Sequence, residues 1–295
     1  MQSADFLSAV FFYLKEGENL NQNWIVENLN NAFSTWNGKL GELWGLVTTG
    51  PQTFKGGAVW SVMQTLHNGM VGIGYALVVL FFAISLCKNT MNFHELKRPE
   101  AAINYFLRFV AAKALVGYGM DIMLNVFSIC NGIVTDMADS MGGISEAMVS
   151  LPAEMQTAIE NVGFLASIPL WLVTILGSLF ITVLSFVMIL TVYGRFFRLY
   201  MYTALAPLPL AAFAGESTQS VGISFLKSYV GVCLEGAVIV LACVIYSAFV
   251  STPTVASGEA TTIVWSYLAE TVFNMLVLVG LIKGSDRIIH EMMGL

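Results

Sequence analysis

Residues 162–194 read VGFLASIPLWLVTILGSLFITVLSFVMILTVYG and contain no Asp, Glu, Lys or Arg. An α-helix needs about 20 apolar residues to cross a bilayer whose hydrocarbon core is about 30 Å thick. The uncharged stretch is long enough for one tilted span and an interfacial turn, but too short for two spans. Pro169 marks either the early part of this helix or a kink in it. We therefore predict one membrane span over residues 164–192.

The composition of the whole chain supports a membrane protein. Hydrophobic residues make up 57% of the 295 residues and charged residues only 11%, whereas soluble domains contain about 45–50% apolar and about 25% charged residues. A soluble globule this poor in charge could not cover its surface with polar groups. The net charge of −6 also gives no support for a globally basic nucleic-acid-binding protein.

Four further apolar stretches predict spans, so we expect an all-α, polytopic transmembrane helix bundle over residues 56–295. About five spans are expected, at residues 68–87, 103–130, 164–192, 229–250 and 262–282. Residues 199–215 are apolar but short, and Pro207 and Pro209 remove two backbone donors and break a helix there. We expect this segment to be re-entrant or interfacial, although a sixth span remains the alternative.

The N-terminal region, residues 1–55, is amphipathic rather than membrane-spanning. Apolar residues recur every three or four positions, which predicts a helix with one apolar stripe, and Gly50-Pro51 is a credible helix stop. The helix could lie on the membrane surface or pack on the span bundle, and both interpretations stay open. The stripe consists of Ile25, Leu29, Phe33, Trp36, Leu40, Trp44 and Val47.

The distribution of basic residues predicts the orientation, because cytoplasmic loops collect Lys and Arg. The first connection between spans carries Lys88, Lys97 and Arg98, and the acidic loop over residues 131–161 carries neither Lys nor Arg. The first connection should therefore be cytoplasmic and the acidic loop external. Arg195 and Arg198 become candidate anchors at the cytoplasmic face. With five spans the N-terminus is external and the C-terminus cytoplasmic, although Lys15, Lys39 and Lys55 count against an external N-terminus.

Four charged residues fall inside predicted spans: Lys113, Asp121, Glu235 and Glu270. Charges within hydrocarbon are costly and usually face the protein interior or water. We expect these residues to point inward, where they would line a polar path or lock helices together. Snorkelling at helix ends or a structural ion pair is the alternative.

Catalytic motifs are not found in the sequence. There is no GxxxxGK[ST] phosphate loop and no GxSxG element, and His290-Glu291 lacks the second His of a zinc-protease helix. The four cysteines form no CxxC pair. We expect neither an enzyme nor a cofactor or metal site.

The segment RFFRLYMYTALAPLPLA, which begins at Arg195 and ends in an Ala-Pro-Leu cluster, suggests a family. Together with the order of apolar segments, it resembles the TrbL-like polytopic inner-membrane subunit of type IV secretion and conjugation machines. The resemblance covers roughly residues 55–290. The chain does not show the long soluble extension that many members carry, so roles that depend on that extension are not expected.

The resemblance implies a channel or assembly subunit in the bacterial cytoplasmic (inner) membrane. Its implied partners are other machine subunits, including cytoplasmic ATPases, further copies of itself, membrane lipid, and transferred DNA or protein. A multi-pass solute or ion transporter is the alternative, favoured by the charges in spans and by the break at Pro207 and Pro209, although no related halves are found. A holin-like or scaffold protein is a third possibility.

Overall fold

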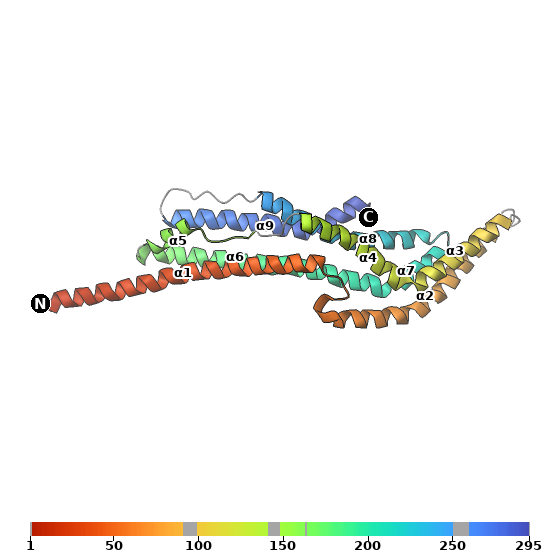
Figure 1. The fold of residues 1–295 in the computed structure, drawn as a ribbon, viewed down its shortest axis with the longest axis horizontal. Coiled ribbons are helices and arrows are strands. Elements are labelled where there is room, and N and C mark those ends of the chain that lie inside the picture. Colours follow the sequence, from red (N-terminus) through yellow and green to blue (C-terminus); the bar gives the residue numbers. More distant parts are fainter. Residues whose placement is uncertain (1, 91–98, 141–147, 163, 250–259, 295) are drawn as a thin grey trace. The chain divides into compact units, whose positions relative to one another are not determined.

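A computed structural model of the chain describes residues 2–90, 99–140, 148–162, 164–249 and 260–294. Over these residues the regular elements are all helices (Figure 1), which confirms the all-α prediction. The long helices are α1 (Gln2–Thr48), α2 (Ala58–Thr90), α3 (Pro99–Gly117), α4 (Gly119–Ser140), α6 (Phe164–Leu205), α8 (Gln219–Phe249) and α9 (Ala260–Met293). The short ones are η1 (Phe54–Gly57), α5 (Ala153–Glu160), α7 (Pro207–Ala211) and η3 (Ala212–Ala214).

Four helical stretches are long and apolar enough to cross a membrane, and they are Phe54–Lys88, Ser167–Leu205, Gln219–Ala248 and Thr262–Met293. The helix pair Ile103–Gly117 and Gly119–Asp139 also qualifies, but it is bent by 73° at its break. The described residues therefore contain four spans by length and composition, or five if the bent pair is one span. The chain is a polytopic helix bundle.

The chain divides into two compact units. Unit 1 consists of Met1–Trp44, Met141–Thr191 and Leu241–Lys283, and unit 2 consists of Gly45–Ser140, Val192–Val240 and Gly284–Leu295. Helices α1, α6, α8 and α9 contribute residues to both units.

Unit 1 is built on the apolar stripe of α1. Within this unit the stripe residues Ile25, Leu29, Phe33, Trp36 and Leu40 are all buried, and the Phe33 ring meets the Tyr267 ring of α9 edge-on. The helix therefore packs into a bundle, which is one of the two arrangements that the amphipathic pattern allows. Other buried members of the unit include Met155, Ile159, Ile181, Met188, Val264 and Leu268.

Side-chain hydrogen bonds to backbone groups hold the segment before α5 in unit 1. The Asn37 amide donates to the Val149 carbonyl at 2.8 Å and accepts from the Val149 N–H at 3.0 Å. The Tyr267 hydroxyl donates to the Ser150 carbonyl at 3.0 Å. These bonds satisfy backbone groups that no helix ladder satisfies.

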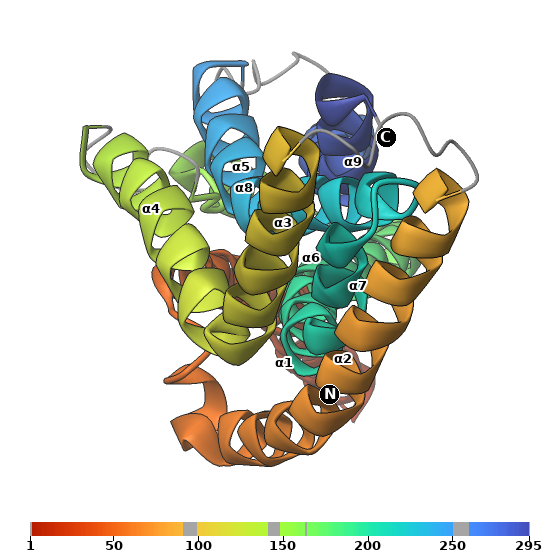
Figure 2. The same ribbon diagram turned by 90° about the vertical axis from the view of Figure 1, so that its right-hand side faces the viewer.

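In unit 2, the short helix α7 lies between α2 and α3 (Figure 2) and packs against both. Its residues Leu210 and Ala211 are fully buried. They belong to a core that also contains Val78, Val116, Met123, Phe127, Leu199, Tyr229 and Cys233.

The proline pair separates α6 from α7. Helix α6 continues through Arg195 and Arg198 to Leu205, and Pro207 is the first residue of α7. A proline ring clashes with the carbonyl four residues earlier and disfavours helical backbone in the residue before it, which accounts for the end of α6 here. Pro207 and Pro209 both lie in the first turn of α7, where backbone donors have no helical partner in any case. The expected re-entrant segment 199–215 is thus divided among the end of α6, α7 and η3.

The stretch 103–130, expected as one span, is divided between α3 and α4. The two helices meet at Gly117-Tyr118-Gly119. A β-carbon on Gly117 would lie 2.7 Å from the Tyr75 hydroxyl, and one on Gly119 would lie 3.2 Å from Leu210 Cδ1. Side chains of α2 and α7 thus lie close to both glycines at the bend, which a count of apolar residues does not reveal.

The region 131–161, expected as an acidic loop, is partly helical. Residues 131–140 belong to α4, and α5 begins directly after Pro152. Residues 141–147 of this region lie outside the described residues, as do Lys97, Arg98 and the expected turn at 251–259.

Candidate functional site

The centre of unit 2 is a fully buried arginine. Arg195, on α6, is 0% exposed, and its guanidinium donates to three backbone carbonyls: Val232 at 3.3 Å, Cys233 at 3.1 Å and Val47 at 3.3 Å. Its guanidinium carbon also lies 6.0 Å from the centre of the Phe127 ring. A buried charge is tolerated only when its donors are satisfied, and here carbonyl oxygens accept them. Arg195, predicted as a candidate anchor at the cytoplasmic face, links α6, α8 and the end of α1 inside this unit.

The end of α1 shows what this link does. The last four carbonyls of a helix have no intrahelical partner, and here each receives a bond. Val47 accepts from Arg195, and Thr48 accepts from the Asn131 amide of α4 at 3.2 Å. Local groups satisfy the other two, since Leu46 accepts from the Thr49 N–H at 3.1 Å and Gly45 from the Thr49 hydroxyl at 2.7 Å.

A glycine on α8 makes room for the buried guanidinium. A β-carbon on Gly236 would lie 2.7 Å from Arg195 Nη1 and 2.9 Å from Cζ. Real side chains do not pack this closely, so any larger residue at position 236 would displace the arginine from the carbonyls of Val232 and Cys233. Sequence reasoning did not identify Gly236, because an isolated glycine in an apolar helix carries no signal of what it faces.

Arg198, one turn after Arg195, is the hub of an ionic cluster. Its Nη2 lies 2.7 Å from both carboxylate oxygens of Glu235 on α8, and its Nη1 pairs with Asp286 on α9. The Ser285 hydroxyl donates to Glu235 at 3.1 Å. Glu235 is 1% exposed, so its charge is neutralised inside the protein. This cluster joins α6, α8 and the C-terminal part of α9.

Aromatic side chains on the same stretch of α6 hold the connection between α1 and α2. The Phe196 ring stacks on Phe54 of η1 at 4.0 Å between ring centres, and the Tyr200 hydroxyl donates to the Pro51 carbonyl at 2.8 Å. The Phe54 ring also meets Tyr193 edge-on. The segment that begins at Arg195 therefore contacts elements from the beginning, middle and end of unit 2.

The four charges expected to form a polar path differ in burial and in the unit to which they belong. Glu235 is buried in the Arg198 cluster, whereas Lys113 on α3, Asp121 on α4 and Glu270 on α9 have exposed side chains. Glu270 also belongs to the other compact unit. Sequence position identified Glu235 and both arginines as charges near or within spans, but it did not pair Arg198 with Glu235.

Metal binding has no structural support in the described part of the chain, where no group of three or more His, Cys, Asp and Glu side chains could hold an ion. The contacts of Arg195 and Arg198 connect α1, α6, α8 and α9. Buried charges are matched by carbonyls and carboxylates.

Comparison with known proteins identifies the family of the chain. No curated protein and no solved structure matches the chain. A family model described as "TrbL/VirB6 plasmid conjugal transfer like protein" matches residues 36–207, which is more than half of the chain. The matched region includes the end of α1 and all of α2 to α6, with both Arg195 and Arg198. The chain belongs to the TrbL/VirB6 plasmid conjugal transfer-like family, whose members are membrane components of type IV secretion.

Proposed function

We propose that the chain is a channel or assembly subunit in the bacterial inner membrane, within a type IV secretion machine that transfers DNA and attached protein. Family membership supports a role in conjugal transfer. Separate cytoplasmic ATPases would supply the energy, because the sequence has no phosphate-binding loop of its own.

The exposure of charges on span-like helices is the observation that carries this proposal. Glu270 has an exposed side chain on a helix that is apolar enough to cross a bilayer, and Lys113 and Asp121 have exposed side chains on the bent helix pair that qualifies as one span. A charge that faces hydrocarbon costs about 2.5–3.5 kcal/mol on insertion scales. These side chains therefore need water or another polypeptide beside them, as in an assembly of several subunits.

Helix α2 supports the same interpretation. Only 17% of the most apolar window within Phe54–Lys88 is buried, and the polar side chains of Gln64 and Asn68 are exposed along it. Polar groups in a bilayer favour contacts with neighbouring helices. We propose that α2 contacts further subunits, either other machine components or copies of this chain, as well as lipid.

We propose that three of the four charged residues expected to line a polar path do so. Lys113, Asp121 and Glu270 would face hydrated space or neighbouring subunits, whereas Glu235 is an interhelical lock because Arg198 and Ser285 occupy its oxygens. A self-contained transporter would need Glu235 to be available to a solute, so its pairing favours the assembly subunit. Coupled uptake into proteoliposomes that is lost with Glu235→Gln would favour the transporter instead.

The test is transfer of a mobile plasmid from donor cells that lack this chain. Deletion should abolish transfer, and the wild-type chain should restore it. Glu270→Leu should lower transfer by about tenfold, the change produced by ~1.4 kcal/mol of lost contact free energy, without lowering the amount of chain in the membrane. Phe273→Leu, which changes an exposed apolar residue on the same helix, is the matched control. Normal transfer after deletion would exclude the proposed role.

A further inference from the structure

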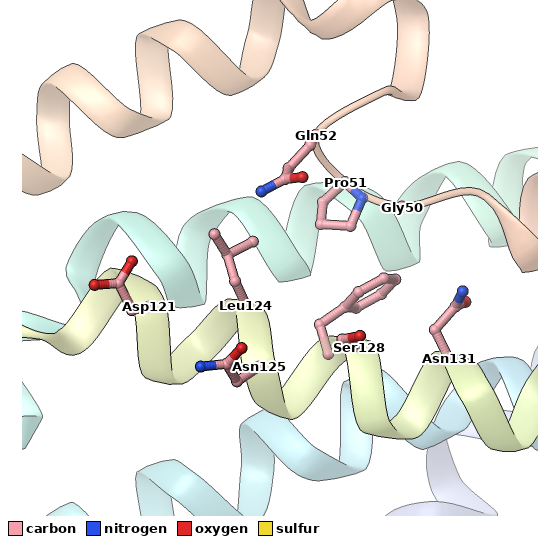
Figure 3. Close-up of a pocket in the computed structure, with 9 residues that line it drawn as sticks. Gly50, Pro51, Gln52, Asp121, Leu124, Asn125, Ser128 and Asn131 are labelled. Atoms are coloured by element: carbon pink, nitrogen blue, oxygen red, sulfur yellow. The ribbon is translucent and has the colours of Figure 1, made fainter.

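A pocket of about 530 Å³ lies in unit 2 between α4 and the connection that follows α1. Figure 3 shows Gly50, Pro51 and Gln52 on one side and a row of α4 side chains on the other. The volume falls within the ~300–1,000 Å³ of small-ligand sites and greatly exceeds the ~30 Å³ that one water molecule occupies in the liquid. The pocket is therefore large enough for more than a single ion.

The lining of the pocket follows from helical spacing. Asp121, Asn125 and Ser128 are separated by four and three residues, so they lie on one face of α4, and Asn131 extends the row by another turn. Gln52 faces this row from the opposite wall (Figure 3). The polar row thus lies within the helix pair that qualifies as a bent span.

The charged and polar residues of the pocket indicate the chemistry of the ligand that would fit it. Among the described residues that line the pocket, Asp121 alone is charged. The pocket therefore carries one negative charge and no positive one. The amides of Gln52 and Asn125 each offer donors and an acceptor, which matches the N–H and carbonyl groups of a peptide backbone. Leu124 and Phe127 add apolar surface.

A polar row in a span-like helix needs a polar occupant, because groups without hydrogen-bond partners are costly at membrane depth. We propose that this pocket binds an extended peptide segment of a partner protein that places a Lys or Arg side chain against Asp121. The amides of Gln52 and Asn125 bond the peptide backbone, and Leu124 and Phe127 contact its stem. This binding can be measured on the purified chain, so it does not depend on the transfer role.

Disulfide tethering to the full-length chain in detergent tests the proposal even if the free affinity is weak. A thiol is placed beside the pocket by Thr53→Cys in a Cys87→Ser background. Thr53 is exposed and follows Gln52 without lining the pocket, and Cys87 is exposed whereas the other three cysteines are buried. The probes are three peptides, Cys-Gly-Lys-Gly, Cys-Gly-Met-Gly and Cys-Gly-Glu-Gly, which compete for capture under reversible thiol exchange. Mass spectrometry measures the captured fraction of each peptide.

The lysine peptide should be captured at least about fivefold more than the other two, a preference worth ~1 kcal/mol. Asp121→Asn should abolish the preference, whereas Asp136→Asn should keep it, because Asp136 is exposed on the same helix but does not line the pocket. Ser128→Trp should lower capture of all three by filling the space. Equal capture of the three peptides, or a preference that survives Asp121→Asn, would overturn the proposal.

Discussion

Arg198 Nη2 lies 2.7 Å from both carboxylate oxygens of Glu235, a residue that is 1% exposed. The same arginine pairs with Asp286 through Nη1. One guanidinium on α6 therefore forms ion pairs with a buried carboxylate on α8 and a half-exposed one on α9. Arg198 and Glu235, which are far apart in the sequence, therefore form an ion pair that connects α6 and α8.

Replacing Arg198 with Met should destabilise unit 2 by about 3 kcal/mol. The loss arises because removal of one partner leaves Glu235 buried and uncompensated, and the low end of the expected range applies because Arg198 is 28% exposed. Denaturant unfolding of the purified chain in detergent, followed by circular dichroism, measures the loss. The double variant Arg198→Met with Glu235→Leu should recover most of it, because the buried carboxylate that lost its partner is removed as well.

The control for this experiment is the pair between Arg287 and Glu291, whose side chains are 86% and 65% exposed. Exposed pairs contribute little, so Arg287→Met should change the free energy of unfolding by less than about 0.5 kcal/mol. Equal losses from the two single variants, or no recovery in the double variant, would show that Glu235 does not depend on Arg198.

Gly236→Ala should destabilise unit 2, although alanine is the better helix former by about 1 kcal/mol. The new methyl group would lie 2.7 Å from Arg195 Nη1 and would push a buried, hydrogen-bonded guanidinium away from its carbonyls. Gly194→Ala is the matched control, because a β-carbon there meets nothing within 4 Å. We expect the melting temperature in detergent to fall for the first variant and to stay level or rise for the second. If both variants behave alike, Gly236 is not needed for the position of Arg195.

The sequence predicts those features of the structure that depend on neighbouring residues, and it fails where a feature depends on residues far apart in the chain. The burial of Ile25, Leu29 and Phe33 follows from helical periodicity, and the end of α6 follows from the local chemistry of Pro207. The bend at Gly117 and Gly119 was missed, because the apolar stretch does not show where side chains of other helices, such as Tyr75 and Leu210, come close to it.

The contacts of Arg195 and Arg198 also show that local features can be predicted from the sequence, whereas long-range partners cannot. Charged residues near spans are visible in the sequence, so Arg195, Arg198 and Glu235 were all selected. Each arginine is separated in sequence from its hydrogen-bond partners by 37 positions or more. No local pattern predicts which carbonyl or carboxylate an arginine will contact. The sequence therefore did not indicate that the Arg195 guanidinium bonds the carbonyls of Val47, Val232 and Cys233.

In unit 1, Asn37→Ala should release the segment that begins at Met148. The Asn37 side chain both donates to and accepts from the backbone of Val149, so the substitution removes two hydrogen bonds at a net cost of about 2 kcal/mol. Hydrogen exchange of the Val149 amide, followed by mass spectrometry, should become faster. Asn31→Ala is a suitable control because Asn31 is an exposed residue of the same helix. Unchanged exchange in Asn37→Ala would mean that other contacts hold the segment.

Reporter fusions should place both Gly215 and Leu295 on the cytoplasmic side. Helix α7 has five residues and so is about 7.5 Å long, far short of the ~30 Å hydrocarbon core, so the chain should not cross the bilayer between α6 and α8. Lys227 and the tail residues Lys283 and Arg287 then share the side that basic residues favour. A phosphatase that is active only outside the cytoplasm should be inactive at both fusion points, and a fluorescent reporter that folds in the cytoplasm should be active at both. A sixth span over residues 199–215 would reverse both results together.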